Sequence, residues 1–312
     1  MTKRYVKAMI PIDITDAMLV SSSIVEPSAS EPAWSPVPTY AEFDKVSVIT
    51  ANSHLVYESL QSGNTNHAPP TLPAISNEWW ILKSYTNRWR MFEWNRGLPS
   101  VGGSPATTVI RPGRCINSIM LLGLKAANVE LTVQNGIGGD VVFQISKNLL
   151  ARYAVTPYEI IFTPFIYDKV FATFDVPPVG DPVITLRLTH PSGVCEVERF
   201  ATGIAIDLGE VEWNTALEDE NYSPITYEAG RANFEPVPNM PGLELPIVID
   251  SNRINRALQF KELGNGKAIV WSAMPTISAY EQMHTMIGPY QRFKISTDNH
   301  KQSSLSVKIR GI

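Results

Sequence analysis

The stretch Val129-Glu130-Leu131-Thr132-Val133-Gln134 decides the expected fold, because apolar and polar residues alternate along it. Successive side chains of a strand point to opposite faces, so this alternation predicts a strand with one buried and one solvent-facing side. Strands of this kind bury their apolar faces by packing in a sandwich or by closing into a small barrel.

Comparable short runs recur along the chain, and turn-forming residues separate them. The 24 prolines and 19 glycines are spread over 312 residues, and proline breaks helices but is tolerated in turns and at sheet edges. Further strands are expected at Lys45–Thr50, His54–Leu60, Asp140–Ile145, Val170–Phe174, Val183–Thr189 and Ser303–Ile309. Short strands repeated in this way predict an all-β chain.

One short helix is expected near the C-terminus, over residues 251–263. Asp250 or Ser251 is suited to the N-cap, and Gly264 follows the expected end. Ile254 and Leu258 lie at helical spacing on one face. The pattern therefore predicts a single helix packed on a sheet.

Shifts in composition divide the chain into four parts. Residues 1–30 are predicted to form an N-terminal arm, and residues 31–96, with five of the seven tryptophans, a small β domain. Residues 97–210 are the most regular strand-rich part and predict a jelly-roll-like β-sandwich. Residues 211–312 are expected to hold an acidic, proline-rich loop, the helix and closing strands. The arm and proline-rich stretches favour contacts within a homo-oligomer.

Charge and cysteine content exclude several classes of function. The net charge is −4 and no Lys/Arg cluster occurs, so binding of nucleic acid through a broad basic face is not expected. Cys115 and Cys195 are expected as two buried thiols, although a single bridge between them is left open. No secretory signal follows Met1 and no apolar run is long enough to span a membrane. We expect a soluble protein made in a cytoplasm.

Segments that resemble enzyme motifs have simpler interpretations. Gly264–Ala268 lacks the glycine spacing and the hydroxyl of a phosphate-binding loop, and predicts a helix C-cap and turn. Gly136–Asp140 predicts a hairpin turn. Glu218–Glu220 is interpreted as a solvated acidic loop, with a partner contact or a weak cation site as the alternative. We therefore expect no enzyme activity, no catalytic residue, no metal ligand set and no cofactor.

Aromatic residues are concentrated in the second part of the chain. The rings in question are those of Trp34, Tyr40, Tyr57, Trp79 and Trp80. A domain this small has little aliphatic core, so one interpretation is that the rings form its core. The alternative is that one or two rings are exposed and stack on sugar.

The pattern Trp34-x5-Tyr40, Tyr57-Glu58-Ser59 and Trp79 resembles the chitin-binding type-3 carbohydrate module. That family has a Gly-Asp-x-Val strand, and Phe43 replaces the glycine here. The resemblance implies that these aromatic residues, together with Trp80, are candidates for carbohydrate binding. Such modules also recur in phage tail proteins as plain structural units.

The run Asn87-Arg88-Trp89-Arg90-Met91-Phe92 is expected to form a strand in which Arg88 and Arg90 share a face. Two guanidinium groups side by side need carboxylates, and Glu93 and Glu78 are the candidates. We interpret Arg88, Trp89, Arg90 and Glu93 as an inter-domain or partner contact. A clamp for an acidic sugar is the alternative.

Two further resemblances involve this run. Trp89-x2-Phe92-Glu93, followed by Ile116–Gly123 and Val129–Val133, is similar to a galactose-binding-like jelly roll, which implies a β-sandwich fold. Trp79-Trp80 and the run from Thr86 to Glu93 resemble a family of bacteriophage tail-fibre-like and virion structural proteins. Segments similar to that family also occur at Pro11–Leu19, Leu121–Leu124, Gly203–Gly209 and Ser304–Gly311.

The phage resemblance implies a non-enzymatic virion protein of the tail, in a fibre, a baseplate or a fibre attachment, assembled in the host cytoplasm. Its partners would be other tail proteins and further copies of itself. The alternative is a receptor-binding protein that recognises host surface polysaccharide through the aromatic domain. Nucleic-acid binding and membrane insertion are not expected.

Overall fold

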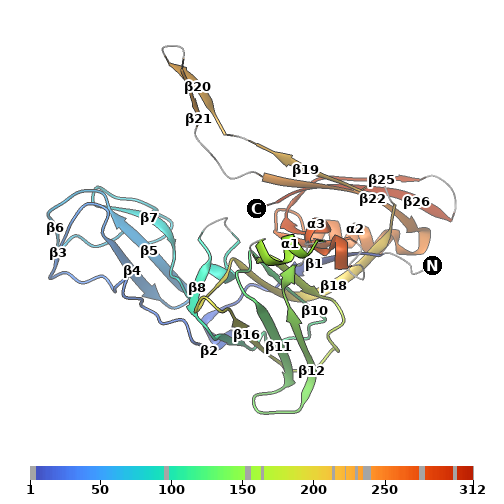
Figure 1. Ribbon diagram of the computed structural model, residues 1–312, viewed down its shortest axis with the longest axis horizontal. Helices are drawn as coiled ribbons and strands as arrows, with labels where there is room; N and C mark the ends of the chain where they lie inside the picture. The colour runs from blue at the N-terminus through green and yellow to red at the C-terminus, as the bar shows by residue number, and fades with distance from the viewer. Residues whose placement is uncertain are drawn as a thin grey trace.

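The computed structural model describes residues 5–94, 98–151, 156–162, 165–212, 215–221, 223–228, 231–234, 240–273, 278–297 and 301–311. Most of these residues lie in β-strands, so the predicted all-β class is confirmed. Figure 1 shows a small β domain on one side, a sandwich in the centre and a larger sheet with helices on the other side.

The small domain is built on a three-stranded sheet with the order β4-β5-β7. Its strands are β3 (Thr39–Tyr40), β4 (Lys45–Thr50), β5 (Ser53–Ser59), β6 (Asn64–Thr65) and β7 (Trp80–Tyr85), and β3 pairs with β6. Aromatic rings supply much of its buried surface, since Tyr40, Tyr57 and Trp80 pack with Val46 and Leu55. Few aliphatic residues are available over so short a stretch, and large rings compensate.

The central unit is a two-sheet sandwich. One sheet has the order β12-β11-β16-β9-β2, and the facing strands are β15, β10 and β18. Their bounds are β2 (Leu19–Ser22), β9 (Ala106–Ile110), β10 (Ser118–Leu122), β11 (Asn128–Asn135), β12 (Val141–Asn148), β15 (Val170–Thr173), β16 (Pro182–Thr189) and β18 (Arg199–Val211), and a separate pair joins β8 (Ser100–Gly103) to β17 (Val194–Val197).

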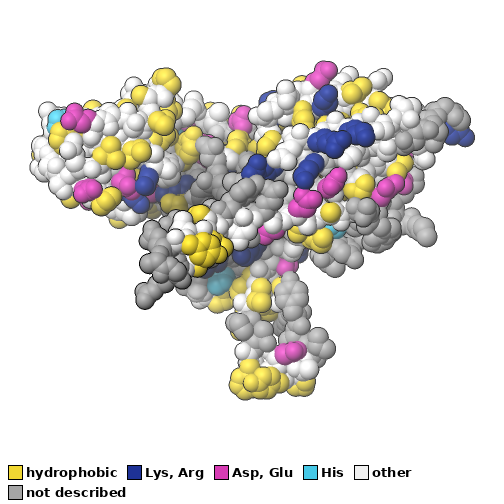
Figure 2. Space-filling view, turned by 90° about the horizontal axis from the view of Figure 1, so that it is seen from above, with side chains coloured by type: hydrophobic (Ala, Val, Ile, Leu, Met, Phe, Trp, Pro, Cys, Tyr) yellow, Lys and Arg dark blue, Asp and Glu magenta, His cyan; other side chains and the backbone are white. Residues whose placement is uncertain are grey.

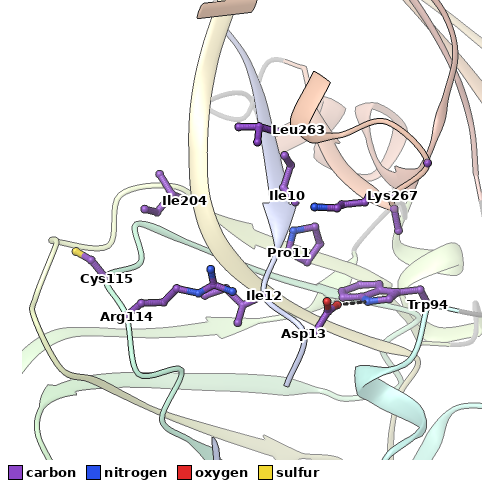
Figure 3. A pocket seen from close by; sticks show the side chains of 12 residues that line it. Ile10, Pro11, Ile12, Asp13, Trp94, Arg114, Cys115, Ile204, Leu263 and Lys267 are labelled. Carbon is purple, nitrogen blue, oxygen red and sulfur yellow. Dashed lines mark hydrogen bonds between the residues drawn. The ribbon is translucent and has the colours of Figure 1, made fainter. Parts of the chain in front are cut away.

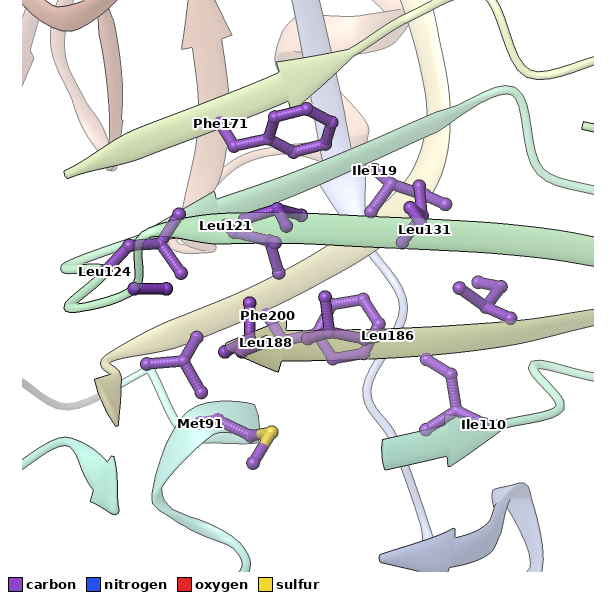
Figure 4. Packing of buried hydrophobic residues seen from close by; sticks show 14 of the residues in the cluster. Met91, Ile110, Ile119, Leu121, Leu124, Leu131, Phe171, Leu186, Leu188 and Phe200 are labelled. Atoms are coloured by element: carbon purple, nitrogen blue, oxygen red, sulfur yellow. The ribbon is translucent and has the colours of Figure 1, made fainter. Parts of the chain in front are cut away.

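Side chains from both sheets interlock to form the core of the sandwich (Figure 4). Val129, Leu131 and Val133 of β11 are fully buried, whereas the residues between them are half-buried, so the predicted alternation is confirmed. These residues pack with Phe171 and Phe200 from the facing strands. The expected turn at Gly136–Asp140 joins β11 to β12, and its Gly136 and Gly138 adopt positive φ.

The third unit is a sheet with the order β24-β23-β1-β18-β22-β26-β25. Its remaining strands are β1 (Tyr5–Pro11), β22 (Met240–Asp250), β23 (Ile269–Ser272), β24 (Thr285–Gly288), β25 (Tyr290–Thr297) and β26 (Gln302–Arg310). The predicted helix is present as a 3-10 turn (Ser251–Arg253) followed by α2 (Ile254–Leu263), with Gly264 at its C-cap. Asp250 makes no side-chain capping bond. Phe260 of α2 packs edge-on against Trp271 of the sheet.

Strand β18 belongs to both larger units. One of its edges pairs with β1 over residues 203–210. Its other edge pairs with β10 over residues 199–203 and then with β22 at residues 210–211. Gly203 lies where these pairings meet, and a Cβ there would come within 2.7 Å of the Ile10 carbonyl oxygen. The glycine therefore allows the strands to approach closely.

The N-terminal residues are not an arm, contrary to the prediction. Strand β1 lies inside the third sheet, between β18 and β23, and Val6, Ala8 and Met9 are fully buried. Strand β2, from the same predicted arm, is an edge strand of the sandwich. Both strands find their partners far along the chain, so the local sequence gives no sign of the pairing.

Many of the described residues between 211 and 245 lie in strands, where a loop is predicted. The acidic residues Glu218 and Asp219 lie in β19 (Ala216–Glu220), which pairs with β22. The Glu218 carboxylate forms an ion pair with Lys308, with a nitrogen–oxygen distance of 2.8 Å. Beyond it β20 (Ile225–Glu228) and β21 (Arg231–Phe234) form a hairpin that extends away from the body of the molecule (Figure 1).

Two short helices were not expected from the sequence. Helix α1 (Pro157–Phe162) follows β13 (Leu150–Ala151) and precedes β14 (Ile166–Tyr167). Helix α3 (Ser278–His284) covers the free edge of β15, where the Gln282 side chain accepts from the amides of Lys169 and Val170 and the Glu281 carboxylate accepts from the amide of Ala172. Side chains thus satisfy edge donors that would otherwise lack partners.

Phe43 provides a test of backbone strain in the small domain. Its φ is 70°, a conformation that favours glycine. The residue is 68% exposed, so little packing would be lost if the side chain were removed. We expect Phe43→Gly to raise the free energy of unfolding by about 1 kcal/mol. Phe43→Ala is the matched control, because it removes the ring and keeps the strain. Equal stability of the two variants in denaturant titrations would contradict this explanation.

Candidate functional site

The predicted contact residues lie at the junction between the small domain and the sandwich. The run that holds them is not a strand, contrary to the prediction. It is a turn followed by a short 3-10 helix (Arg90–Phe92), with Trp89 in helical conformation. Met91 and Phe92 are buried in the sandwich core, so the run carries apolar anchors on one side and polar groups on the other. Arg88 and Arg90 do not share a strand face.

The carboxylates that pair with the two arginines come from a different segment than predicted. Arg90 forms an ion pair with Glu31, in which both side chains are nearly buried. The Nε of Arg88 donates to the Ile24 carbonyl at 2.8 Å, and one of its terminal nitrogens lies 3.5 Å from Glu26. Neither predicted partner, Glu78 or Glu93, is used in this way.

Glu26 is the centre of the junction. Its carboxylate accepts hydrogen bonds from the Thr86 hydroxyl, from the Trp89 indole at 3.2 Å and from His54 Nδ1 at 2.9 Å. The other ring nitrogen of His54 lies 2.8 Å from a carboxylate oxygen of Asp16. His54 also stacks on Trp89, with ring centroids 4.4 Å apart. The network ties β5 of the small domain to segments that belong to the sandwich.

Glu93 lies beside this network rather than in an ion pair. It lines a small void with Tyr85 and His54. Burial raises the pKa of the Glu93 carboxyl, and nearby Asp13 adds to the increase, while a hydrogen bond with Tyr85 opposes it. Desolvation disfavours the charged form of a carboxyl group, so Glu93 lies in an environment that resists ionisation.

Most of the aromatic candidates belong to the core. Tyr57 and Trp80 are at most 1% exposed and Tyr40 is buried with them, so none of these rings offers a free face to a sugar. Trp34 and Trp79 are half-buried. Trp79 stacks on His67, with ring centroids 3.8 Å apart and the planes nearly parallel. The sugar-stacking role predicted for the domain therefore rests on Trp34 and Trp79.

A larger pocket, of about 570 Å³, lies between the sandwich and the third sheet. Five separate segments line it. They contribute Ile10–Asp13, Trp94, Arg114–Cys115, Ile204, and the end of α2 with its following turn (Leu263 and Gly266–Ala268). Arg114 and Lys267 point into it from opposite sides (Figure 3). The Trp94 indole donates to Asp13 at 2.9 Å.

The pocket combines two cations, Arg114 and Lys267, and one carboxylate, Asp13, with aliphatic surface. In the described part of the chain, no carboxylate is within ion-pair distance of Arg114 or Lys267. Ile204 and Leu263 are 54% and 64% exposed, which leaves aliphatic surface open beside two cations. A volume of this size is within the range that holds organic ligands or a few side chains.

No pattern in the sequence predicts this pocket. The sequence predicts only a turn after α2 for Lys267, and the structure contains that turn. Arg114 and Trp94 carry no local pattern that marks a site. The five segments meet only because β1 lies beside β18 and because α2 crosses the sheet, and no spacing in the sequence encodes that meeting.

The described residues also bear on the expectations for thiols, metal ligands and membrane-spanning helices. Both cysteines are free thiols, Cys195 buried and Cys115 half-buried, and burial raises the pKa of Cys195. No group of three or more His, Cys, Asp or Glu side chains among the residues described could hold a metal ion. No helix in that part of the chain is long and apolar enough to cross a membrane.

No protein family, curated protein or solved structure matches the chain.

The Arg90–Glu31 pair should be important for stability. Glu31→Ala leaves a nearly buried guanidinium without its carboxylate, and we expect a loss of about 3 kcal/mol in the free energy of unfolding. The matched control is Asp181→Ala, which breaks the exposed Arg111–Asp181 pair and should change stability little. Equal losses in urea titrations of the two variants would show that the junction pair is not stabilising.

Glu93 should make stability depend on pH. Because its folded pKa is raised, the group favours folding below the unfolded pKa, and this contribution is lost as pH rises through the folded value. We expect Glu93→Gln to gain stability relative to wild type as pH rises from about 4 to 7. Urea titrations at several pH values measure the difference, and a difference that stays constant would rule out ionisation of Glu93 as the cause.

Proposed function

We propose that this chain is a non-enzymatic structural protein of a bacteriophage tail, in a fibre, a baseplate or a fibre attachment. In this role it joins neighbouring virion proteins and is assembled in the host cytoplasm. The run that carries the most specific resemblance to tail proteins, Thr86 to Glu93, supports the proposal through its position. It fastens the small domain to the sandwich through Glu26 and Glu31.

The arrangement of the three β units favours an assembly role. The strand β18 and the buried charges at the junction fix the units against one another, as a component that transmits load requires. Apolar side chains are exposed on segments that extend from this frame. Ile225 and Tyr227 of the β20–β21 hairpin are more than half exposed, and exposed apolar residues on projecting segments are typical of contacts with other proteins.

Immunogold labelling of phage particles tests the proposal. An antibody against the purified protein should label the tails of particles that are purified from cells producing it. Label confined to heads, or absence of the protein from purified particles, would overturn the assignment.

Binding to a host glycan is the second candidate, and the stacked Trp79–His67 pair favours it. Because the Trp79 ring is half-buried at the domain surface, Trp79→Ala should abolish binding on a glycan array without unfolding the domain. Binding that Trp79→Ala abolishes would assign receptor recognition to the small domain. If the protein binds no surface polysaccharide, the assembly role is the only proposed function that remains.

A further inference from the structure

We infer that two copies of this chain associate through the free edge of β12, and that the two β12 strands pair antiparallel across a two-fold axis at Ile145. The sandwich sheets that end in β12 then form one continuous sheet through both copies. This contact between identical copies adds detail to the assembly role proposed above, and in that respect it rests on that role.

The outer edge of β12 has no strand beside it. β12 is the last strand of its sheet and pairs with β11 alone. In the part of the chain that the structure describes, no group outside β11 hydrogen-bonds to the backbone of residues 141–148. A strand of eight residues is about 27 Å long. Its unpaired N–H and carbonyl groups form a template for a further strand.

Other edge strands of the two larger units are protected against such pairing. Helix α3 covers the edge of β15. Strand β25 carries exposed Arg292 and Lys294, and Figure 2 shows Lys and Arg side chains gathered over β25 and β26. Strands β2 and β24 have only four residues each. A covering element, charge and short length are devices that prevent strand addition.

Strand β12 has none of these three devices. Its residues 141–146, Val-Val-Phe-Gln-Ile-Ser, include no charged residue and no proline. The one charge of the strand is held against the core of its own chain. Lys147 Nζ lies 2.6 Å from the carboxylate of Glu281 on α3 and 5.7 Å from the centroid of the Phe171 ring. A lysine held in this way does not guard the edge.

The core of the sandwich is open at the same edge. Phe143 and Ile145 oppose Val133 and Leu131 of β11, so they point to the core face of the sheet. Val133 and Leu131 are fully buried, whereas Phe143 and Ile145 are only half-buried, because β12 is the last strand. A further strand with apolar residues on this face would cover them and continue the core.

A second copy of β12 fits this edge. A two-fold axis perpendicular to the sheet keeps the core faces of both copies on one side and sets the residue at the axis against its own copy. A bulge disturbs the start of the strand, and the register is regular from Phe143 onward. Ile145 lies at the centre of Phe143–Lys147. With the axis there, two β-branched side chains meet on the core face, which is a favourable cross-strand pair.

The pairs on either side of the axis are compatible as well. Phe143 would face the stem of Lys147 on the core face, and Gln144 would face Ser146 on the outer face, where both side chains donate and accept hydrogen bonds. No two like charges are opposed. Strand β25 could not pair with itself in this way, because Arg292 would face Lys294 of the second copy. The distribution of charge therefore favours β12 as the strand that pairs with itself.

Disulfide formation between two variants tests the register. Gln144→Cys and Ser146→Cys each place an exposed thiol on the outer face. Both carry Cys115→Ser, because Cys115 is the less buried native thiol. The purified full-length variants, one lengthened by a tag, are mixed under reducing conditions and then mildly oxidised. We expect the mixed dimer to exceed each homodimer by about tenfold on non-reducing gels, because pairing holds these two thiols side by side.

Ile137→Cys is the matched control partner for Ser146→Cys. Ile137 is exposed in the turn of the β11–β12 hairpin, away from the edge, so this mixture should give only the statistical excess of random collisions. Equal yields of mixed dimer from the two mixtures would overturn the inference. Homodimers of Gln144→Cys or Ser146→Cys that are as abundant as their mixed dimer would also overturn it, because they show that the axis is not at Ile145.

Sedimentation velocity gives an independent measurement. Gln144→Lys adds a charge at the edge and should weaken dimerisation by about tenfold. Thr132→Lys is the matched control, because Thr132 opposes Gln144 one strand further in, and it should leave the dimer intact. Circular dichroism checks that both variants keep the fold. A wild-type chain that is monomeric at about 100 μM, or a dimer that neither lysine weakens, contradicts pairing through β12.

A strand from another virion protein is the alternative occupant. If Gln144→Cys cross-links to a different protein in purified particles while the purified chain stays monomeric, the edge belongs to that partner and the inference is wrong. The measurements on purified protein can fail while the virion labelling succeeds, and the reverse, so failure of the pairing is distinguishable from failure of the proposed function.

Discussion

The pairing of β18 on both of its edges is the constraint on which the rest of the structure depends. Each buried peptide group needs a hydrogen-bond partner, and this strand meets the need with β1 on one edge and with β10 and then β22 on the other. The same backbone therefore belongs to two hydrophobic cores, one in the sandwich and one below α2. Neither core can shift without breaking bonds that the other requires.

The junction and the pocket follow from that constraint. Trp89, Met91 and Phe92 pack into the sandwich core, and this anchoring positions the arginines that hold Glu26 and Glu31. The next residues bring Trp94 beside Asp13, at the end of β1. The pocket lies where the crossing sheets leave space between them, so its cations owe their positions to the topology and not to a local motif.

The sequence reveals the parts of this molecule that are determined locally. The alternation in β11, the turn at Gly136–Asp140 and the end of α2 at Gly264 are confirmed, because each depends on residues that are neighbours in the chain. The interior position of β1 and the pairing of Arg90 with Glu31 were not predicted. These depend on segments that only the complete topology brings together, and side-chain patterns carry no record of which distant strand or carboxylate is the partner.

The place of β1 also has a consequence for biosynthesis. This strand is synthesised long before its two partners, residues 203–210 and 269–272. Residues 31–94 can form their own small core while translation continues, but β1 cannot complete its pairing until residue 272 has emerged. Contacts between such distant residues form slowly, and an unpaired apolar strand is prone to aggregate in the meantime. The nascent chain is therefore prone to aggregate between the synthesis of β1 and that of β23, and a chaperone would protect it over this interval.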